Sequence, residues 1–423
     1  MRKDRRSFIK KGGAAGLGML AGSGMGFTAT PFGLPSDFST TEEKGESIIG
    51  PYGPWVNSLY NKQIPSLSFR KDSFKDISAW KKQARAKAIE RLGVPDLGTA
   101  PEVTVHKTYT YDGLQVEEIS WQLPYGRPTE AIVLKPLDAP EKLPGILAFH
   151  CHSGIKYFGK EKIARTSDRH HEVIEGAFER YYEDRPWANE IAKKGYVVMI
   201  PDAFTFGSRR VLPEEVPEHM RRGLPEQDDR STEYIDAYNT WASNHEHVMA
   251  KSLFCGGTTW PGMFFAEDNI ALDILCERPD VDEKRIGCGG LSGGGLRTVM
   301  TAGLDDRISC AVCVGFMSTW TDFLLNKSHT HTWMTYAPIL PQELDFPEIL
   351  GLRLPLPTMV LNDSEDQLYT LAEMEKARDI LEEIFTKAGA KEKFQCSFYP
   401  GPHKFDIAMQ EEAFAWLDKW LST

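Results

Sequence analysis

The chain has 423 residues, of which 41% are hydrophobic and 26% are charged, and its formal net charge is −11. This is the composition of a globular protein with ample apolar material for a core. The negative balance argues against nucleic acid and against anionic membrane surfaces as partners, because both repel an acidic protein.

The first 30 residues are expected to be an export signal outside the fold. The segment Asp4-Arg5-Arg6-Ser7-Phe8-Ile9-Lys10 matches a twin-arginine motif, and a mildly apolar, glycine-rich stretch follows it to about Thr30. A membrane span needs about 20 predominantly apolar residues, and this stretch is too interrupted for stable membrane insertion. We therefore expect recognition by the twin-arginine translocase and a periplasmic or secreted protein.

Residues 31–100 are predicted to form an N-terminal extension with one helix. The stretch 31–70 is rich in proline, glycine and serine, whereas apolar residues recur at helical spacing between Ser73 and Leu92. The catalytic domain is then expected over residues 101–423. It begins with three segments that alternate like antiparallel strands, at 103–111, 115–123 and 129–134.

From Pro144 onward, strands and helices alternate, which predicts a mostly parallel sheet with helices on both faces. Two long stretches, about 203–265 and 316–350, interrupt this alternation as irregular inserts, and such loops more often form binding walls or lids than simple connections. The expected strands lie at 146–149, 196–200, 285–289, 308–314, 356–361 and 393–399, and the expected helices at 187–194, 266–277, 296–304, 371–388 and 406–421.

The seven cysteines imply no disulfide framework, because their number is odd and the chain is long. Cys310 and Cys313 match a C-x-x-C pattern but lie within a strand-like run, where positions three apart face opposite sides. No second pair completes a zinc site. Both are therefore predicted to be core cysteines.

The segment Gly290-Leu291-Ser292-Gly293-Gly294 carries the strongest chemical signal. It joins a predicted strand to a predicted helix and matches the G-x-S-x-G nucleophile elbow, in which a strained turn presents a serine hydroxyl. Glycine is needed there because the turn and the approaching substrate leave no space for Cβ atoms. Ser292 is therefore the candidate nucleophile.

An acid and a histidine follow Ser292 in the order that a catalytic triad can use. Each comes just after a predicted strand, at the sheet edge where open α/β sheets place their chemistry. His403 is the expected base. Asp363, Glu365 and Asp366 compete for the acid, with Asp366 favoured by its distance from the strand and Asp363 next.

An oxyanion hole requires two backbone N–H groups that point at the developing negative charge. One is expected from Gly293, after the nucleophile, and the other from Cys151 or His152, after the strand at 146–149. The second insert and the first contain arginines and aromatic residues suited to a carboxylate or a sugar ring. Arg209, Arg210, Trp260 and Trp320 are the substrate-binding candidates.

A metal-dependent hydrolase is an alternative from a different class. Three H-x-H pairs, His150/His152, His245/His247 and His329/His331, could supply imidazole ligands on a barrel. Antiparallel N-terminal strands do not fit such a barrel, and the elbow would then have no role. No metal and no cofactor are therefore expected.

From about Pro144 to the C-terminus, the chain resembles the α/β-hydrolase superfamily, and within it the dienelactone-hydrolase and acetyl-xylan-esterase-like bacterial proteins. The resemblance covers about two-thirds of the chain. It rests on the segments His150–Gly154, Lys156–Lys162, Arg185–Ala188, Gly195–Val198, Pro201–Phe204, Arg285–Gly294, Asp305–Ile308 and Pro402–Phe405 with Trp416-Leu417. It implies a Ser-His-Asp esterase that needs no cofactor, although Cys151 stands where such proteins often have glycine, and dienelactone hydrolases themselves use a cysteine nucleophile.

The resulting hypothesis is an exported serine esterase acting through an acyl-enzyme, with a small-molecule or glycan ester as its substrate. An acetyl or other small acyl group on a plant or algal glycan is the first expectation. A peptidase or amidase on the same fold is the second. A binding protein without activity is disfavoured, because all three triad positions are filled.

Overall fold

The computed structural model describes residues 47–61, 64–137 and 142–422. The expected export signal and the first part of the N-terminal extension lie outside these residues. Within the described part of the chain, no helix is long and apolar enough to cross a membrane.

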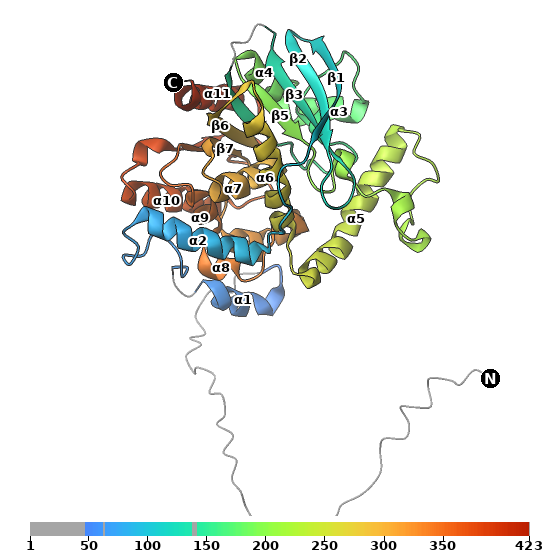
Figure 1. Ribbon diagram of the computed structural model, residues 1–423. Coiled ribbons are helices and arrows are strands. Elements are labelled where there is room, and N and C mark those ends of the chain that lie inside the picture. The colour runs from blue at the N-terminus through green and yellow to red at the C-terminus, as the bar shows by residue number, and fades with distance from the viewer. Residues whose placement is uncertain (1–46, 62–63, 138–141, 423) are drawn as a thin grey trace, which may run out of the picture. The chain divides into compact units, whose positions relative to one another are not determined.

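A nine-stranded sheet forms the centre of residues 47–422, with the strand order β1-β2-β3-β5-β4-β6-β7-β8-β9. Figure 1 shows this sheet with helices packed around it. Pairing is antiparallel from β1 through β2 and β3 to β5, and parallel from β5 to β9. The strands are β1 (Val103–Tyr111), β2 (Leu114–Trp121), β3 (Thr129–Pro136), β4 (Leu143–Ala148), β5 (Val197–Pro201), β6 (Val281–Leu291), β7 (Ile308–Val314), β8 (Thr358–Asp363) and β9 (Phe394–Tyr399).

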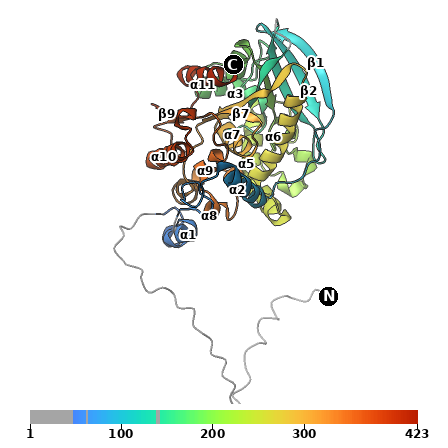
Figure 2. The ribbon, with the colours of Figure 1, turned by 60° about the vertical axis from the view of Figure 1, so that its left-hand side comes forward.

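Helices cover both faces of the sheet, and Figure 2 shows β1 and β2 at one edge with α10 and α11 toward the other. The helices are α1 (Gly53–Tyr60), α2 (Ile77–Leu92), α3 (Glu172–Tyr182), α4 (Trp187–Lys193), α5 (Thr232–Gly256), α6 (Trp260–Glu277), α7 (Gly293–Leu304), α8 (Leu340–Glu343), α9 (Phe346–Gly351), α10 (Leu371–Lys387) and α11 (Ile407–Leu421). The α/β class with antiparallel N-terminal strands is as predicted.

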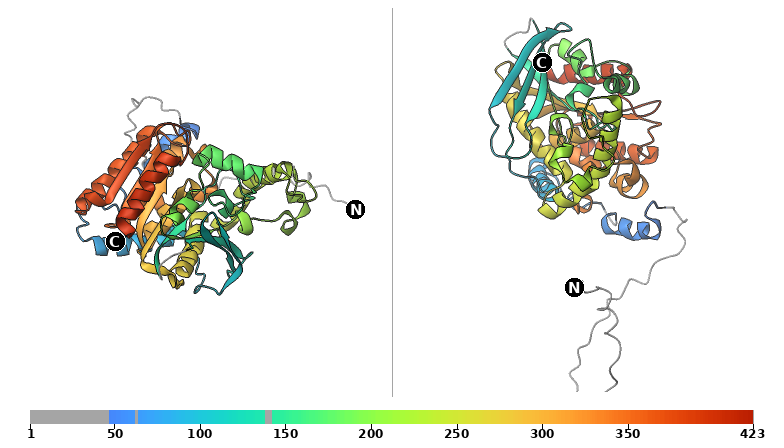
Figure 3. Two further views of the ribbon diagram at one scale, coloured as in Figure 1. Left: turned by 90° about the horizontal axis from the view of Figure 1, so that it is seen from above. Right: turned by 90° about the vertical axis from the view of Figure 1, so that its right-hand side faces the viewer.

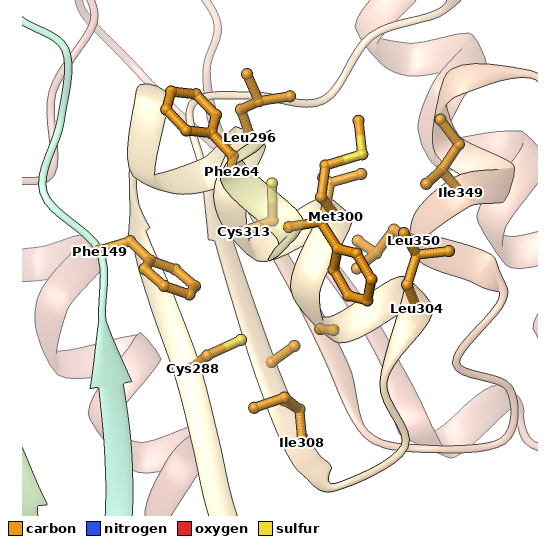
Figure 4. Packing of buried hydrophobic residues seen from close by; sticks show 14 of the residues in the cluster. Phe149, Phe264, Cys288, Leu296, Met300, Leu304, Ile308, Cys313, Ile349 and Leu350 are labelled. Atoms are coloured by element: carbon orange, nitrogen blue, oxygen red, sulfur yellow. The ribbon is translucent and has the colours of Figure 1, made fainter. Parts of the chain in front are cut away.

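Two apolar cores lie on opposite faces of the sheet. Side chains alternate between them along each strand. Met199 of β5 belongs to the core that includes residues of α2, α6, α7, α9 and α10, whereas Val198 belongs to the core that includes residues of α3, α4 and α11. Cys310 and Cys313 of β7 divide in the same way and are both buried and unpaired, as predicted. Figure 4 shows the packing around α7, where Met300 and Leu304 meet Ile349 and Leu350 of α9.

Several helices were not predicted from the sequence. The expected helix over 73–92 is α2, but α1 precedes it in the stretch expected to be extended. The insert at 203–265 is not irregular throughout, because it contains the 25-residue α5 and the first turns of α6. Ser231 caps the start of α5 by accepting from Tyr234 N, and Gly257 ends it with φ of 93°.

Candidate active site

The turn from β6 into α7 holds Ser292 in a strained conformation. Ser292 has φ of 85° and ψ of −109°, a region that residues with a Cβ rarely occupy. Its amide donates to Val314 O at 2.9 Å. A Cβ on Gly290 or Gly294 would overlap the carbonyl oxygen of Phe149, so glycine is required where the elbow crosses the end of β4. The elbow predicted around this serine is present.

His403 follows β9 and is held by a carboxylate that follows β8. Its Nδ1 lies 2.5 Å from Asp366 Oδ2, and Leu368 N donates to the other carboxylate oxygen at 2.9 Å. This pairing places the ring proton on Nδ1. Nε2 has no partner among the described residues, and His403 and Ser292 line one pocket. The nitrogen that would act as a general base therefore makes no hydrogen bond within the described part of the chain.

Asp363 occupies a different position from Asp366. It is fully buried at the end of β8 and accepts from Lys404 N at 2.9 Å rather than from the imidazole. Burial raises the pKa of its carboxyl to about 8, and the neighbouring Asp366 adds to the rise. Of the three carboxylates that the sequence left open, Asp366 is the one that contacts His403.

The loop of residues 150–154 lies against the elbow. A Cβ on Gly293 would stand 3.0 Å from His152 N, so these two backbone segments are adjacent. Neither the Gly293 amide nor those of Cys151 and His152 donate to an acceptor within the described ranges. The structure therefore brings together the amides named as oxyanion candidates.

Lys162 stabilises the 150–154 loop by binding its carbonyl groups, a role that was not predicted from the sequence. Its fully buried ammonium donates to the carbonyl oxygens of Cys151 at 2.5 Å, Ile155 at 2.9 Å and His152 at 3.2 Å. Burial lowers the pKa of Lys162 to about 8. The only sequence signal was a lysine-rich segment next to the loop, which gives no direction for the side chains.

Glu246 of α5 contacts His152 of the same loop and Lys156 just after it. Its Oε1 lies 2.5 Å from Lys156 Nζ and 3.4 Å from His152 Nε2. His152 Nδ1 accepts from Gly154 N at 3.0 Å, which leaves the ring proton on Nε2 to meet the carboxylate. Burial lowers the pKa of His152, so the neutral ring is favoured. These contacts give the helix in the first insert a direct connection to the loop beside Ser292.

The pocket at Ser292 has a volume of about 300 Å³. Apolar groups dominate its wall, and the side chains that form it come from the elbow, the 150–154 loop, α3 and the second insert. Besides the residues above, it is lined by Tyr181, Leu291, Leu296, Phe316, Thr330, His331, Thr332, Met334, Thr335 and Leu368. This volume lies at the lower end of the range of about 300–1,000 Å³ that is typical of small-molecule pockets.

The histidine pairs do not form a metal site within the described residues. His150 is buried with both ring nitrogens engaged, Nδ1 with Cys151 O at 3.1 Å and Nε2 with Ala203 N at 3.1 Å. His331 Nε2 meets Leu368 O at 3.0 Å. The group with ligand-like spacing in the described ranges is Asp363, Asp366 and His403, and its histidine already pairs with Asp366.

The four substrate-binding candidates do not line the Ser292 pocket. Arg209 is buried in an ion pair, with Nη2 2.7 Å from Glu267 Oε1. Arg210 lies over the Tyr157 ring at 4.5 Å. Trp260 and Trp320 are buried in the core, the latter donating to Leu344 O at 3.0 Å. Aromatic and arginine residues in long inserts were here recruited to pack those inserts.

A strained serine turn at the carboxyl end of β6, with an aspartate and a histidine after β8 and β9, belongs to the α/β-hydrolase fold, as predicted. No family model matches the chain. A protein of Bacillus subtilis provisionally named hydrolase YtaP is 28% identical over 294 residues, which are 69% of this chain and 83% of that protein.

Two solved structures have the same fold. A protein from Bacteroides fragilis, provisionally described as an acetyl xylan esterase, aligns with a TM-score of 0.62 and 16% identity over 85% of this chain and 84% of its own. The glucuronoyl esterase from Solibacter usitatus aligns with a TM-score of 0.56 and 13% identity over 84% and 97%. At these identities the likeness concerns the fold.

Proposed function

We propose that the chain is a serine hydrolase that cleaves a carboxylic ester through an acyl-enzyme. The observation that carries the proposal is the shared pocket of Ser292 and His403, in which Nδ1 of the histidine is 2.5 Å from Asp366 and Nε2 has no partner in the described part of the chain. A serine hydroxyl reacts at neutral pH only when a base takes its proton, and this arrangement supplies such a base.

In the proposed reaction, Ser292 Oγ attacks the ester carbonyl carbon while His403 Nε2 takes the hydroxyl proton. The carbonyl π electrons move to oxygen and then return as the bond to the alcohol breaks, and the imidazolium gives its proton to the departing alkoxide. Water then attacks the acyl-enzyme with the same proton transfers. An acid is released and the serine hydroxyl is restored. Asp366 keeps Nδ1 protonated and stabilises the imidazolium.

The negative charge on oxygen would be met by the amides of Gly293 and of Cys151 or His152. Removing one oxyanion donor typically costs about 2.7–4 kcal/mol of transition-state stabilisation. The adjacency of the two backbone segments and the three Lys162 hydrogen bonds behind the loop support this assignment. A rigid loop suits the role, because donors that are already oriented need no reorganisation during the reaction.

The proposed substrate is a carbohydrate ester with a small acyl group. The pocket of about 300 Å³ suits an acetyl or similar acyl chain. Carbohydrate esters are named for both structural neighbours, and this supports the same substrate class here. The Arg5-Arg6 motif supports export by the twin-arginine translocase to the periplasm or beyond.

The test is intact-mass analysis after treatment with a fluorophosphonate, alongside the Ser292→Ala variant. We expect one adduct on the wild-type protein and none on the variant. An unlabelled but folded wild-type protein would refute an activated serine, and a labelled variant would refute its assignment to Ser292. Activity that survives chelator treatment would separate this enzyme from a metal-dependent hydrolase.

A further inference from the structure

A second, larger cavity opens beside the Ser292 pocket. It is a groove of about 810 Å³ between α3 and α5, the green and yellow-green helices of Figure 3. Ser153, Gly154 and Tyr181 line both the groove and the Ser292 pocket. A ligand whose reacting end reaches Ser292 can therefore extend into the groove without leaving the protein surface.

The α5 wall of the groove carries polar side chains that make no hydrogen bonds to other described residues. Asp236, Thr240, Ser243 and Asn244 line it at the spacing of one helix face, and none of their side chains bonds to another residue of the described ranges. Such a stripe on its own would be an ordinary solvated helix face. What distinguishes this one is the opposing helix and the connection to the Ser292 pocket.

Asn239 is a buried polar group at the base of the same wall. It is 8% exposed, and its Oδ1 accepts from Lys156 N at 2.9 Å and from Tyr157 N at 3.0 Å. These two bonds fix which end of the amide is oxygen. Its Nδ2 has no partner among the described residues, although the residue lines the groove. Nδ2 is not one of the fully buried unpaired atoms of the described residues, so it is accessible from the groove and can offer two donors to a bound molecule.

The α3 wall leaves space for a bulky ligand. Gly176 and Ala177 are its smallest lining residues, and a Cβ on Gly176 would meet no atom within 4 Å. The charged lining groups are Glu172, Arg180 and Asp236, two acids and one base. This balance disfavours an anionic ligand, because no surplus cation is available to pair with it.

We propose that this groove binds the alcohol part of the ester, and that this part is a neutral oligosaccharide of several sugar units. The inference rests on the proposed function and specifies its substrate. Hydroxyl, amide and carboxylate side chains supply the donors and acceptors that sugar hydroxyl groups require, and Tyr181 lines the place where the groove meets the pocket. A short acyl group in the Ser292 pocket and a long polar alcohol in the groove account for the different sizes and linings of the two cavities.

The test uses Gly176→Trp, which fills the groove from an open, helical position. The matched control is Gly256→Trp, at a helical glycine of α5 that also meets no atom within 4 Å and lines neither cavity. We expect Gly176→Trp to lower kcat/KM at least tenfold on an acetylated xylotetraose and to leave kcat/KM on 4-nitrophenyl acetate within twofold. The control should change neither value. Equal values for Gly176→Trp and wild type on the oligosaccharide would overturn the proposal.

A binding measurement separates this inference from the proposed function. Calorimetric titration of Ser292→Ala with unmodified xylohexaose should show binding that Gly176→Trp removes and Gly256→Trp retains. An oligosaccharide bearing glucuronic acid should bind no more tightly than xylohexaose. Absence of binding, or tighter binding of the acidic sugar, would overturn the groove assignment. Failure of fluorophosphonate labelling would overturn the serine mechanism alone, since the titration needs no catalysis.

Discussion

Gly315 offers a sharp test of how the active-site histidine is positioned. It follows β7 with φ of +56°, and a Cβ on it would lie 2.9 Å from Cε1 and 3.2 Å from Nδ1 of His403. The Asp366 carboxylate restrains the imidazole through its 2.5 Å contact with Nδ1. An ordinary contact needs a distance of 3.4 Å. The methyl group of Gly315→Ala therefore has to displace the imidazole ring by about 0.5 Å.

The size of the effect follows from the geometry of proton transfer. A displacement of about 1 Å at a catalytic group can cost about 100-fold in rate, so a shift half as large is expected to lower kcat about 10- to 100-fold. That corresponds to about 1.4–2.7 kcal/mol of activation free energy. Alanine at positive φ also costs about 1–2 kcal/mol of folding stability.

The assay is the hydrolysis of 4-nitrophenyl acetate, with thermal unfolding to confirm the fold. Gly389→Ala is the matched control, because Gly389 has φ of +68° and open space around its Cβ position. It should lose similar stability and keep full activity. If Gly315→Ala retained kcat within threefold of the wild type, or if the control lost as much activity, the account of the His403 position would be refuted.

Two further predictions concern buried titratable groups near the site. Lys162→Met should lower kcat at least tenfold with little change in KM, because the carbonyl groups of the 150–154 loop lose their donor. The control is Lys160→Met, which removes a neighbouring buried lysine paired with Asp202. This control should destabilise the fold and leave kcat unchanged. Asp363 has a pKa of about 8 in the folded protein and about 3.9 unfolded, so its stabilisation is present below about pH 4 and is lost as the pH rises through 8. Asp363→Asn should therefore flatten the decline in unfolding free energy between about pH 5 and 8 in urea titrations, and an unchanged slope would contradict the buried, protonated carboxyl.

The elements that could be predicted from the sequence are those with an unambiguous period. Buried parallel strands such as β5 and β7 are continuous apolar runs, and β1 to β3 alternate. The helix α5 was missed because it carries polar residues on one face and aromatic residues among histidines on the other, without a clean apolar stripe. The capping residue Ser231 and the terminal Gly257 mark the two ends of this helix in the sequence. The segment between them is too polar to suggest a buried helix.

The candidate site divides in the same way. Chain order and strand ends located Ser292 and His403, because a fold places those positions at one sheet edge. Order could not choose between Asp363 and Asp366, since the choice depends on how the loop after β8 turns. The role of Lys162 could not be predicted for a related reason, because it depends on three carbonyl groups that only the folded loop brings together.

One helix of the first insert, α5, both contacts the loop beside Ser292 and lines the polar groove. Glu246 and Asn239 face the 150–154 loop and the segment after it, where they bond to Lys156, His152 and Tyr157. Neighbouring positions of α5, with Asn239 itself among them, line the polar groove. A ligand that draws α5 toward α3 must therefore act on the same backbone that is proposed to hold the oxyanion. Binding energy from a remote sugar unit can in this way contribute to kcat as well as to KM, and shortening the oligosaccharide should lower both kcat and affinity.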